Sequence, residues 1–293
     1  MRRALTRALR LWRPRAIVYS TPQSTMLQPA ARLVGATAVR FDVPAARNRR
    51  GLGTSFLHRL ERRSLRKVRL LLPIGMAPAA YQHIPAVETP MVALPIPIDR
   101  PRDIRNDRND REALAVTYAG NPLKKGLDFA ARAWTAARPA GWRLVVTGIE
   151  EEAGRAFLRR RGVEDVEDIK WAGVVEPEPY RHLLEQAAVF LSASRYEDYG
   201  LAQLEALAAG ALLVTAPSDG AYEALAYARE IDGRLVAADL SAQALARALR
   251  AAFELGAPER TEYRRRAREL TEGHSREELQ SRLEKDVLPI LLG

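Results

Sequence analysis

Two acidic residues, Glu197 and Glu205, lie eight positions apart on either side of Gly200. The apolar stretch 188–193 before them is typical of a buried strand, and the apolar spacing over 201–208 is helical. We therefore expect Glu197 in the loop at the carboxyl end of a strand, where open α/β sheets bind their ligands. Glu205 is expected on or beside the apolar face of the helix, where a carboxylate is rarely buried without a partner.

The groups offered by this strand, loop and helix suit a sugar linked to a diphosphate. The helix start at Gly200 and Leu201 presents free backbone N–H groups, which favour a phosphate. Each carboxylate has two oxygens that accept hydrogen bonds from neighbouring hydroxyl groups of a sugar or a ribose. The segment 194–210 therefore predicts a binding site for a sugar nucleotide.

Strand-like and helical patterns alternate from residue 113 to about residue 254, which predicts an α/β fold with a doubly wound parallel sheet. The expected strands cover 114–118, 142–147, 169–172, 188–193, 212–216 and 234–236. The expected helices cover 127–137, 153–161, 180–187, a stretch after Gly200, 221–229 and 242–254, followed by 263–271 and 276–292. The first third offers strand candidates at 16–19, 38–41 and 68–73, between arginine-rich helices.

A proline-rich segment divides the chain. Residues 93–98 are expected to be extended, because each proline biases its predecessor away from helix. Residues 99–112 alternate arginines with aspartates and asparagines and lack periodicity, as an interdomain linker does. We expect an amino-terminal domain over 1–98, this linker, and a carboxyl-terminal domain over 113–272. A last helical segment, 273–293, is a candidate for packing back on the first domain.

The composition bounds the class of protein. At 293 residues, with 47% apolar and 28% charged residues, the chain is typical of a soluble globular protein with room for two domains. The absence of cysteine excludes disulfides, thiolate catalysis and thiolate–metal sites, and fits a cytoplasmic location. The basic start 1–13 lacks the apolar core of a signal peptide. No run of roughly 18 apolar residues predicts a membrane span.

The net charge of +10 is unevenly distributed. Residues 1–98 hold 17 Lys/Arg against 3 Asp/Glu, whereas residues 99–293 hold 29 against 33. This asymmetry suggests an anionic partner for the amino-terminal third, such as lipid head groups or a phosphorylated acceptor. The basic stretch 59–69 fits a helix lying on an anionic membrane and fits a solvated surface equally well. Nucleic acid is disfavoured, because no recognisable reader motif accompanies the charge.

Residues 193–210 resemble the signature of the retaining GT-B glycosyltransferases of family 4, the group 1 transferases. That family shows a Glu, seven residues and a second Glu, with an aromatic–Gly pair after the first and a small-residue–Gly ending. The matching positions are Glu197, Tyr199–Gly200, Glu205 and Ala209–Gly210. The resemblance implies that Glu197 is the catalytic residue contacting the donor sugar and that Glu205 binds the nucleotide ribose. It also implies that the amides of Gly200 and Leu201 hold the donor diphosphate.

A second segment, 116–128, is similar to the first strand of that family and its Lys–Gly turn. The similarity implies that Lys125 binds the donor diphosphate and that Gly120 lies in the loop facing the donor. The family often has an arginine after this glycine. Here Asn121 stands in that position as a candidate diphosphate ligand, with Lys124 as a candidate replacement cation.

A third segment, 216–225, resembles the glycine-containing loop of the family, which implies that Gly220 lets the backbone approach the donor. The resemblance covers about 113–255 and is weak over 1–98. It implies a GT-B-like fold, with two Rossmann-type doubly wound domains facing a cleft. The amino-terminal one is expected to be incomplete, because the family's opening strand and glycine-rich loop are missing. A start codon assigned too late is an alternative.

The function implied by the resemblance is the transfer of a sugar from a nucleotide-sugar donor to an unknown acceptor, a glycan, a lipid or a small molecule, with retention of anomeric configuration. No metal ion or cofactor is expected. The four histidines show no metal-ligand spacing. A non-catalytic homologue that binds a nucleotide sugar stays open as the alternative, because the first half of the chain is short.

Overall fold

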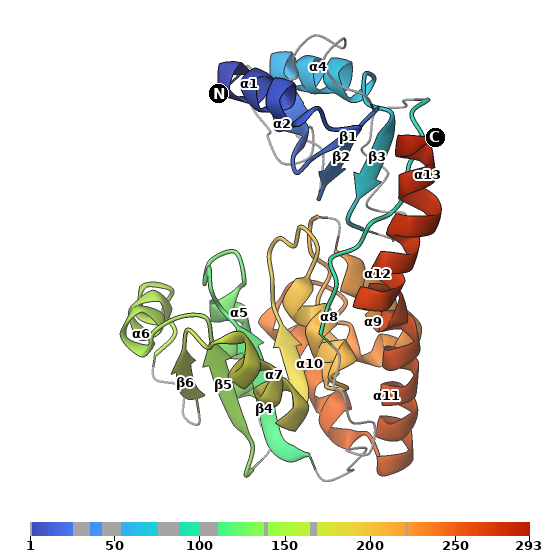
Figure 1. Cartoon of the computed structure of the whole chain (residues 1–293). Helices are drawn as coiled ribbons and strands as arrows, with labels where there is room; N and C mark the ends of the chain where they lie inside the picture. The colour runs from blue at the N-terminus through green and yellow to red at the C-terminus, as the bar shows by residue number, and fades with distance from the viewer. Residues whose placement is uncertain are drawn as a thin grey trace. The chain divides into compact units, whose positions relative to one another are not determined.

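The computed structural model describes residues 2–25, 36–42, 54–75, 88–99, 111–137, 140–164, 169–220 and 222–293. The chain divides into two compact units (Figure 1). Met1–Pro97 and Arg276–Gly293 form the amino unit, and Ile98–Ser275 form the carboxyl unit. Most of the segment expected as a linker, 99–112, lies outside the described residues. The last helices are thus counted with the amino unit, and the carboxyl unit extends to Ser275 rather than 272.

The amino unit contains a parallel sheet of three strands in the order β1-β2-β3. Ala16 pairs with Ala36, and Ala38 pairs with Leu70. The strands are β1 (Ala16–Tyr19), β2 (Ala36–Phe41) and β3 (Leu70–Pro73). The helices are α1 (Arg2–Trp12), α2 (Pro22–Thr25) and α4 (Thr54–Leu65), followed at the end of the chain by α12 (Arg276–Arg282), the π-helical turn η5 (Leu283–Val287) and α13 (Leu288–Leu292). The three strands lie where the sequence indicated them.

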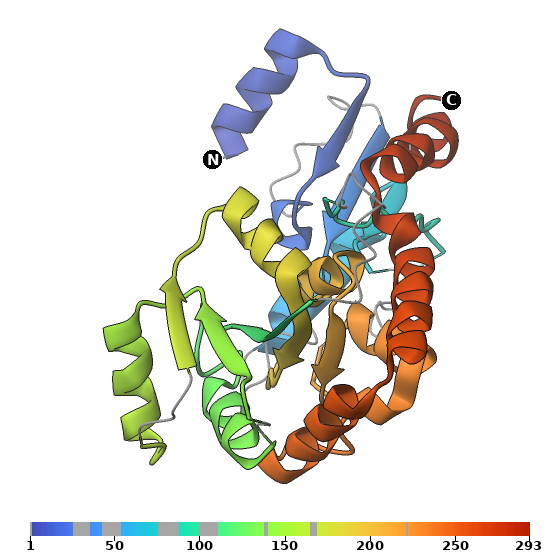
Figure 2. The same ribbon diagram turned by 90° about the horizontal axis from the view of Figure 1, so that it is seen from below.

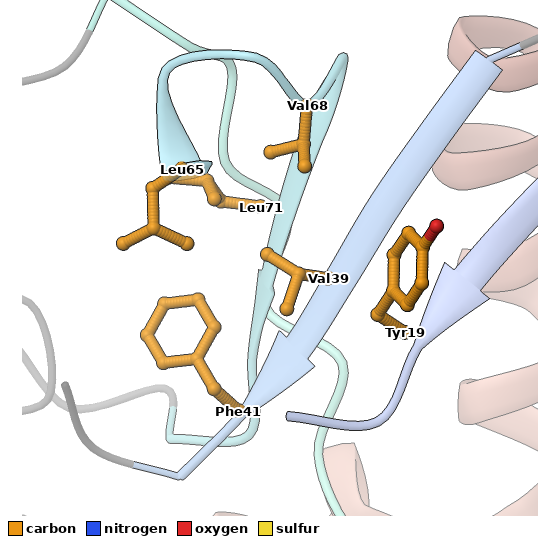
Figure 3. Packing of buried hydrophobic residues seen from close by; sticks show 6 residues of the cluster. All are labelled: Tyr19, Val39, Phe41, Leu65, Val68 and Leu71. Carbon is orange, nitrogen blue, oxygen red and sulfur yellow. The ribbon is translucent and has the colours of Figure 1, made fainter. Parts of the chain in front are cut away.

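The two faces of this sheet carry alternate side chains, since successive residues of a strand point to opposite sides. On one face Val39 and Phe41 pack with Leu65 and Val68, at and just after the end of α4 (Figure 3). On the other face, Ala38, Leu70 and Leu72 pack with Val287 and Leu291 of the last helical stretch. Figure 2 shows this stretch, in red, along the sheet. The amino unit is therefore a sheet with helices on both faces.

The carboxyl unit contains a five-stranded parallel sheet in the order β6-β5-β4-β7-β8, which confirms the predicted doubly wound arrangement. The strands are β4 (Glu112–Tyr118), β5 (Arg143–Thr147), β6 (Ile169–Gly173), β7 (Ala187–Ser192) and β8 (Leu212–Thr215). The chain adds strands outward from β4 to β6 and then returns to β7 on the other side of β4. The strand order therefore reverses between β4 and β7, and sheets of this kind bind ligands at such a point.

Helices cover both faces of this sheet, because right-handed crossovers in opposite directions lie on opposite faces. Helix α5 packs against α10, while α8 packs against α7 and α11. The helices are α5 (Leu127–Ala137), α6 (Glu151–Arg160), α7 (Pro177–Gln186), α8 (Leu201–Ala208), α9 (Glu223–Asp232), α10 (Ala242–Glu254) and α11 (Ala257–Thr271). Two 3₁₀ helices, η3 (Gly233–Leu235) and η4 (Glu272–His274), follow α9 and α11. The strand expected over 234–236 is wrong: η3 occupies most of it, and only Val236 bridges to Thr215.

Candidate functional site

Two loops of the carboxyl unit meet at the reversal of strand order. One, 119–126, follows β4, and the other, 193–200, follows β7. Because β4 and β7 are parallel neighbours, their carboxyl ends lie at the same edge of the sheet. The backbone N–H of Arg195 donates to the carbonyl of Lys124 at 2.9 Å, so the loops are joined through the main chain.

The central contact joins Lys125 of the first loop to Glu197 of the second. The Lys125 Nζ lies 2.8 Å from Oε1 and 2.9 Å from Oε2 of Glu197. The Lys125 side chain is 17% exposed and that of Glu197 is 3% exposed, so solvent reaches the pair from the lysine side. The ring centroid of Tyr118 lies 5.7 Å from the same Nζ. Gly120 leaves space for this ring, because a Cβ there would lie 2.3 Å from the Tyr118 hydroxyl.

Two further side chains hold the Glu197 carboxylate, and sequence reasoning missed both. The hydroxyl of Ser194 donates to Oε1 at 2.6 Å, and Nε2 of Gln203 donates to the same oxygen at 2.7 Å. Gln203 also donates to the Ser192 hydroxyl at 2.8 Å. The sequence signal that could have indicated Gln203 is its amide on the apolar side of a predicted helix, because a buried polar group needs a hydrogen-bond partner. Within the described residues Oε2 has one hydrogen bond, from Lys125, which leaves it able to accept another.

Two glycines let the loops approach more closely than any side chain would allow. Gly126 has φ +65°, and a Cβ there would lie 1.8 Å from the carbonyl oxygen of Ala193. Gly220 has φ +113°, and a Cβ there would lie 1.7 Å from the carbonyl oxygen of Glu197. The Glu197 N–H donates to the Asp219 carbonyl at 2.9 Å. Gly220, expected beside the donor, thus presses directly on the backbone of Glu197.

Asn121 shapes the first loop. Its Oδ1 accepts a hydrogen bond from the Lys124 N–H at 3.0 Å, and its carbonyl accepts one from the Lys125 N–H at 2.8 Å. The Lys124 ammonium lies 2.5 Å from Oδ2 of Asp198 and 5.2 Å from the centroid of the Tyr196 ring. Both lysines of the turn thus meet the β7 loop. The diphosphate contact expected of Asn121 stays a prediction.

Helix α8 begins immediately after Gly200, which has φ +88° and provides no side-chain cap. The first N–H groups of a helix have no acceptor within it, so this end, including Leu201, carries a partial positive charge. A Cβ at Gly200 would lie 2.8 Å from the ring of Tyr222, whose hydroxyl lies 2.8 Å from that of Thr215. The amides expected to hold a diphosphate therefore follow a glycine that packs closely against Tyr222.

Glu205 lies on α8 in a separate polar group. Burial, and after it the negative charge of Asp99, raise its pKa to about 7. The pKa of Tyr180 of α7 is also raised, mainly by burial and to a smaller extent by the charges of Glu205 and Tyr118. The Tyr180 hydroxyl is buried without a hydrogen-bond partner among the described residues. The two predicted acids thus differ in surroundings: Glu197 pairs with Lys125, whereas Glu205 lies near Asp99 and Tyr180.

Arg195 clamps the two loops, a role that sequence reasoning also missed. Its guanidinium donates to both carboxylate oxygens of Asp128 at 2.9 and 2.7 Å, and to the Leu123 carbonyl at 2.8 Å. It also lies 4.3 Å from the centroid of the Phe129 ring. Burial favours the neutral acid at Asp128, but the hydrogen bonds and charge of Arg195 outweigh it and lower the pKa. The Lys125 turn is therefore fixed from both ends.

The described parts of the chain lack two other features, a metal-binding cluster and a membrane-spanning helix. No three His, Asp or Glu side chains there gather as they would around a metal ion. None of the described helices combines the length and the apolar character needed to cross a bilayer. The expectation of a reaction without metal or cofactor stays a prediction.

The site lies within a region that matches a known family. The family model described as Glycosyl transferases group 1 matches residues 113–254, which run from β4 to α10. A curated protein of Xanthomonas oryzae pv. oryzae, GDP-mannose:cellobiosyl-diphosphopolyprenol alpha-mannosyltransferase, is 34% identical over 77 residues. This alignment covers 25% of the present chain and 20% of the relative, so the match spans about a fifth of that protein.

Solved structures resemble the chain over nearly its whole length. An alpha,alpha-trehalose-phosphate synthase (UDP-forming) from Burkholderia xenovorans has a TM-score of 0.71 at 15% identity, over 98% of this chain and 76% of that one. A glycosyltransferase from Rickettsia africae has a TM-score of 0.74 at 12% identity, over 99% of this chain and 80% of that one. These likenesses show the GT-B fold that the sequence indicated.

Proposed function

We propose that this chain, whose residues 113–254 match the group 1 glycosyl transferases, transfers a sugar from a nucleotide-sugar donor to an acceptor. The observation that carries the proposal is the buried Lys125–Glu197 pair at the reversal of strand order. The names of two similar proteins support a nucleoside diphosphate donor, since one refers to GDP-mannose and the other to UDP formation.

Lys125 is the proposed diphosphate ligand. An ammonium group has three N–H donors, so two can face the oxygens of Glu197 while the third meets a phosphate oxygen. The positive end of α8, at Gly200 and Leu201, adds a second attraction from a neighbouring element. Together they would stabilise the negative charge that develops on a departing diphosphate.

Glu197 and Glu205 are the proposed hydroxyl acceptors. Oε2 of Glu197 has room for a hydrogen bond from the donor sugar, while Ser194 and Gln203 fix the other oxygen. Glu205 would accept from the ribose in its ionised form, beside the buried hydroxyl of Tyr180. The two acids would then bind the two ends of the donor, with the diphosphate between them.

The proposed reaction retains the anomeric configuration. The bond between the anomeric carbon and the diphosphate oxygen breaks, and the nucleoside diphosphate leaves with the bonding electrons. The acceptor oxygen bonds to the oxocarbenium-like carbon from the same face, and its proton passes to the departing diphosphate. No protein base, metal ion or cofactor is part of this proposal. Proton NMR of the product anomeric centre tests it, and an inverted product would contradict it.

We also propose that the acceptor is presented at an anionic membrane surface on the cytoplasmic side. Helix α1 ends with Leu11 and Trp12, which are 76% and 77% exposed, and it carries exposed arginines at 3, 7 and 10. Cations beside exposed apolar side chains suit the interface of an anionic bilayer. The name of the Xanthomonas relative refers to a diphosphopolyprenol acceptor, which is consistent with a lipid-linked substrate.

The first experiment identifies the donor and then removes the pair. Thermal-shift measurements with UDP-, GDP-, ADP- and dTDP-sugars select the donor, and its consumption by the purified chain is then followed. Lys125→Met and Glu197→Gln should each lower kcat/KM at least about 100-fold, as removal of one electrostatic contact to a transition state does. The exposed Lys170 of β6 provides the control, since Lys170→Met should retain the wild-type rate.

A double variant separates chemistry from stability. Breaking a buried ion pair from one side typically destabilises a fold by about 3–5 kcal/mol. Lys125→Met with Glu197→Gln is uncharged at both positions, so it should regain melting temperature and not activity. Wild-type kcat/KM in either single variant would remove the site assignment. Donor binding without consumption by the wild type would indicate the non-catalytic alternative.

A further inference from the structure

Tyr199 lies between Glu197 and Gly200, in the segment proposed to bind the donor, and both ends of this residue are held. Its carbonyl accepts a hydrogen bond from the N–H of Glu223 at 3.1 Å. Its hydroxyl lies 2.9 Å from Nδ1 of His274, and the His274 side chain is fully buried. The two rings meet edge to face, with centroids 6.1 Å apart. His274 therefore fixes the far end of the aromatic side chain in the signature.

The other ring nitrogen of His274 is also bound. Its Nε2 lies 3.0 Å from the hydroxyl of Tyr227, which in turn donates to Oε1 of the buried Glu223 at 3.2 Å. Because the Tyr227 hydroxyl donates its proton to Glu223, the Tyr227 oxygen accepts a hydrogen bond from the Nε2–H of His274. A neutral histidine ring carries one N–H, so its Nδ1 has no proton and accepts from the hydroxyl of Tyr199. One tautomer thus satisfies these three hydrogen bonds, and buried networks are rigid when every member is paired.

The backbone of His274 lies where the chain passes between its two units. The chain crosses at Pro97–Ile98 and again at Ser275–Arg276. The N–H of Ile98 donates to the carbonyl of His274 at 2.9 Å, which ties the two crossing points together. One residue thus contacts a crossing point through its main chain and the signature segment through its ring.

We propose that His274 is a positioning residue, which holds Tyr199 and with it the segment 197–200, and couples that segment to the two crossing points of the chain. The expected effect of His274 on catalysis rests on the proposed function, whereas its structural role does not. Tyr199 is two residues after Glu197 and immediately precedes the glycine at the start of α8. A shift of Tyr199 therefore moves the acid and the helix amides together.

A matched pair of variants tests the consequence for activity. Tyr199→Phe and Tyr227→Phe each remove one hydroxyl and leave one nitrogen of His274 without that partner. If His274 acts through Tyr199, Tyr199→Phe lowers kcat/KM for donor consumption by about 10- to 100-fold, while Tyr227→Phe changes it by less than about 3-fold. Equal losses of kcat/KM in the two variants, or no loss in Tyr199→Phe, would overturn the proposal. A histidine that only stabilises the fold would be affected equally by the loss of either tyrosine hydroxyl.

Two replacements of the ring itself sharpen the test. The amide of an asparagine reaches the position of Nδ1, beside Tyr199, and that of a glutamine reaches the position of Nε2, beside Tyr227. His274→Asn should therefore retain more activity than His274→Gln, with the melting temperature of each recorded. The reverse order contradicts the proposal.

Hydrogen exchange provides a readout that does not need activity. In Tyr199→Phe, the amides of 195–204 should exchange several-fold faster than in the wild type. In Tyr227→Phe, the same amides should exchange at the wild-type rate. A peptide over 95–98 reports only Ile96 and Ile98, because prolines carry no amide hydrogen, and its exchange should also rise in Tyr199→Phe. Unchanged exchange in both peptides overturns the coupling. A wild type that neither binds nor consumes any donor would defeat the proposed function, while exchange would still decide the role of His274.

Discussion

The two units place their charges in opposite ways. In the carboxyl unit, two charged pairs at the loops after β4 and β7 are mostly buried: Lys125 with Glu197, and Arg195 with Asp128. In the amino unit, arginines 3, 7 and 10 of α1 and the arginines of the region 59–69 are exposed. Both units are parallel sheets with helices, so the difference lies in burial and not in architecture.

This difference separates two kinds of recognition. A buried charge loses its hydration, and that loss is offset only when its partners are fixed in good geometry, so such a charge selects one ligand shape. Exposed arginines keep their hydration and their rotamer freedom, and they create a field that attracts any anionic surface. In the proposed function, the carboxyl unit therefore carries the donor chemistry, and the exposed arginines of the amino unit provide a broad, shape-independent attraction.

The largest expected effect is at the contact between the two loops. Gly126 and Gly162 both have φ +65°, but a Cβ at Gly126 would lie 1.8 Å from a carbonyl oxygen, whereas at Gly162 it would meet only Arg132 at 3.7 Å. Both alanine variants suffer the strain of the left-handed backbone, about 1–2 kcal/mol. Gly126→Ala should lose a further 1–3 kcal/mol or more, from overpacking of about that size. Urea unfolding measures the difference, and equal losses would mean that the loops are not pressed together.

The next effect concerns the clamp between the loops. Arg195→Ala leaves the largely buried Asp128 without its bidentate partner and should destabilise the fold by about 1.5–3 kcal/mol. Arg265 on α11 is a matched control, because it binds Glu262 and Glu269 on an exposed surface. Arg265→Ala should change stability by less than about 1 kcal/mol. Similar losses in the two variants would remove the contrast between buried and exposed pairs.

The same clamp has a pH signature with a defined sign. The pKa of Asp128 is lowered in the folded state, so its contribution is present above its ordinary pKa and is lost as pH falls through the folded value. The stability gap between the wild type and Arg195→Ala should therefore narrow below about pH 4. A gap that widens in acid would contradict the ion pair.

A smaller effect, of opposite sign, is expected at Glu205. Its folded pKa of about 7 lies above the ordinary value of 4.5, so the folded state keeps a proton that the unfolded state releases. The stability of the wild type relative to Glu205→Gln should fall between about pH 4.5 and pH 7 and then stay constant. Nucleotide affinity should rise over the same range in the wild type only, since the ionised acid is the proposed hydroxyl acceptor. Parallel curves for the two proteins would exclude this role.

The sequence predicted the elements well where the signal was local. Helices 127–137 and 242–254 begin and end where their apolar spacing does, and the strand candidate 16–19 is β1. The sequence also placed Lys125 and Glu197 each after a strand of the predicted sheet, but the strand order that brings the two side chains together comes from the structure. The error at 234–236 is of the expected kind: three residues are too few for periodicity to distinguish a strand from a 3₁₀ turn.

The partners of the site residues were not accessible from the sequence. Arg195 and Asp128 lie 67 positions apart, and Tyr199 and His274 lie 75 apart, so no local pattern links them. Asp99 was assigned to a linker, yet its charge acts on Glu205 of α8. Such contacts depend on how the chain returns to the same sheet edge. Only the structure supplies that information.

The smallest effect on donor consumption is expected from substitutions in the amino unit. Leu11→Ser with Trp12→Ser alters two side chains that are already exposed, so stability should change by less than about 0.5 kcal/mol and donor consumption in solution should be unchanged. Binding to vesicles of phosphatidylglycerol should fall several-fold, because the apolar part of the interfacial contact is gone. Val174 of the carboxyl unit is 74% exposed, so Val174→Ser is a matched control that should bind vesicles as the wild type does.

Salt and lipid charge separate the two parts of that contact. The attraction of the arginines should weaken as ionic strength rises from 0.01 M to 0.15 M, since the Debye length shortens from about 30 Å to about 8 Å. Vesicles of phosphatidylcholine remove the anionic partner at constant salt and should bind the wild type weakly. If vesicle binding by the wild type depends neither on ionic strength nor on lipid charge, electrostatic attraction by the amino unit is contradicted. An equal loss in Val174→Ser would show that exposed apolar area alone governs binding, whichever unit carries it.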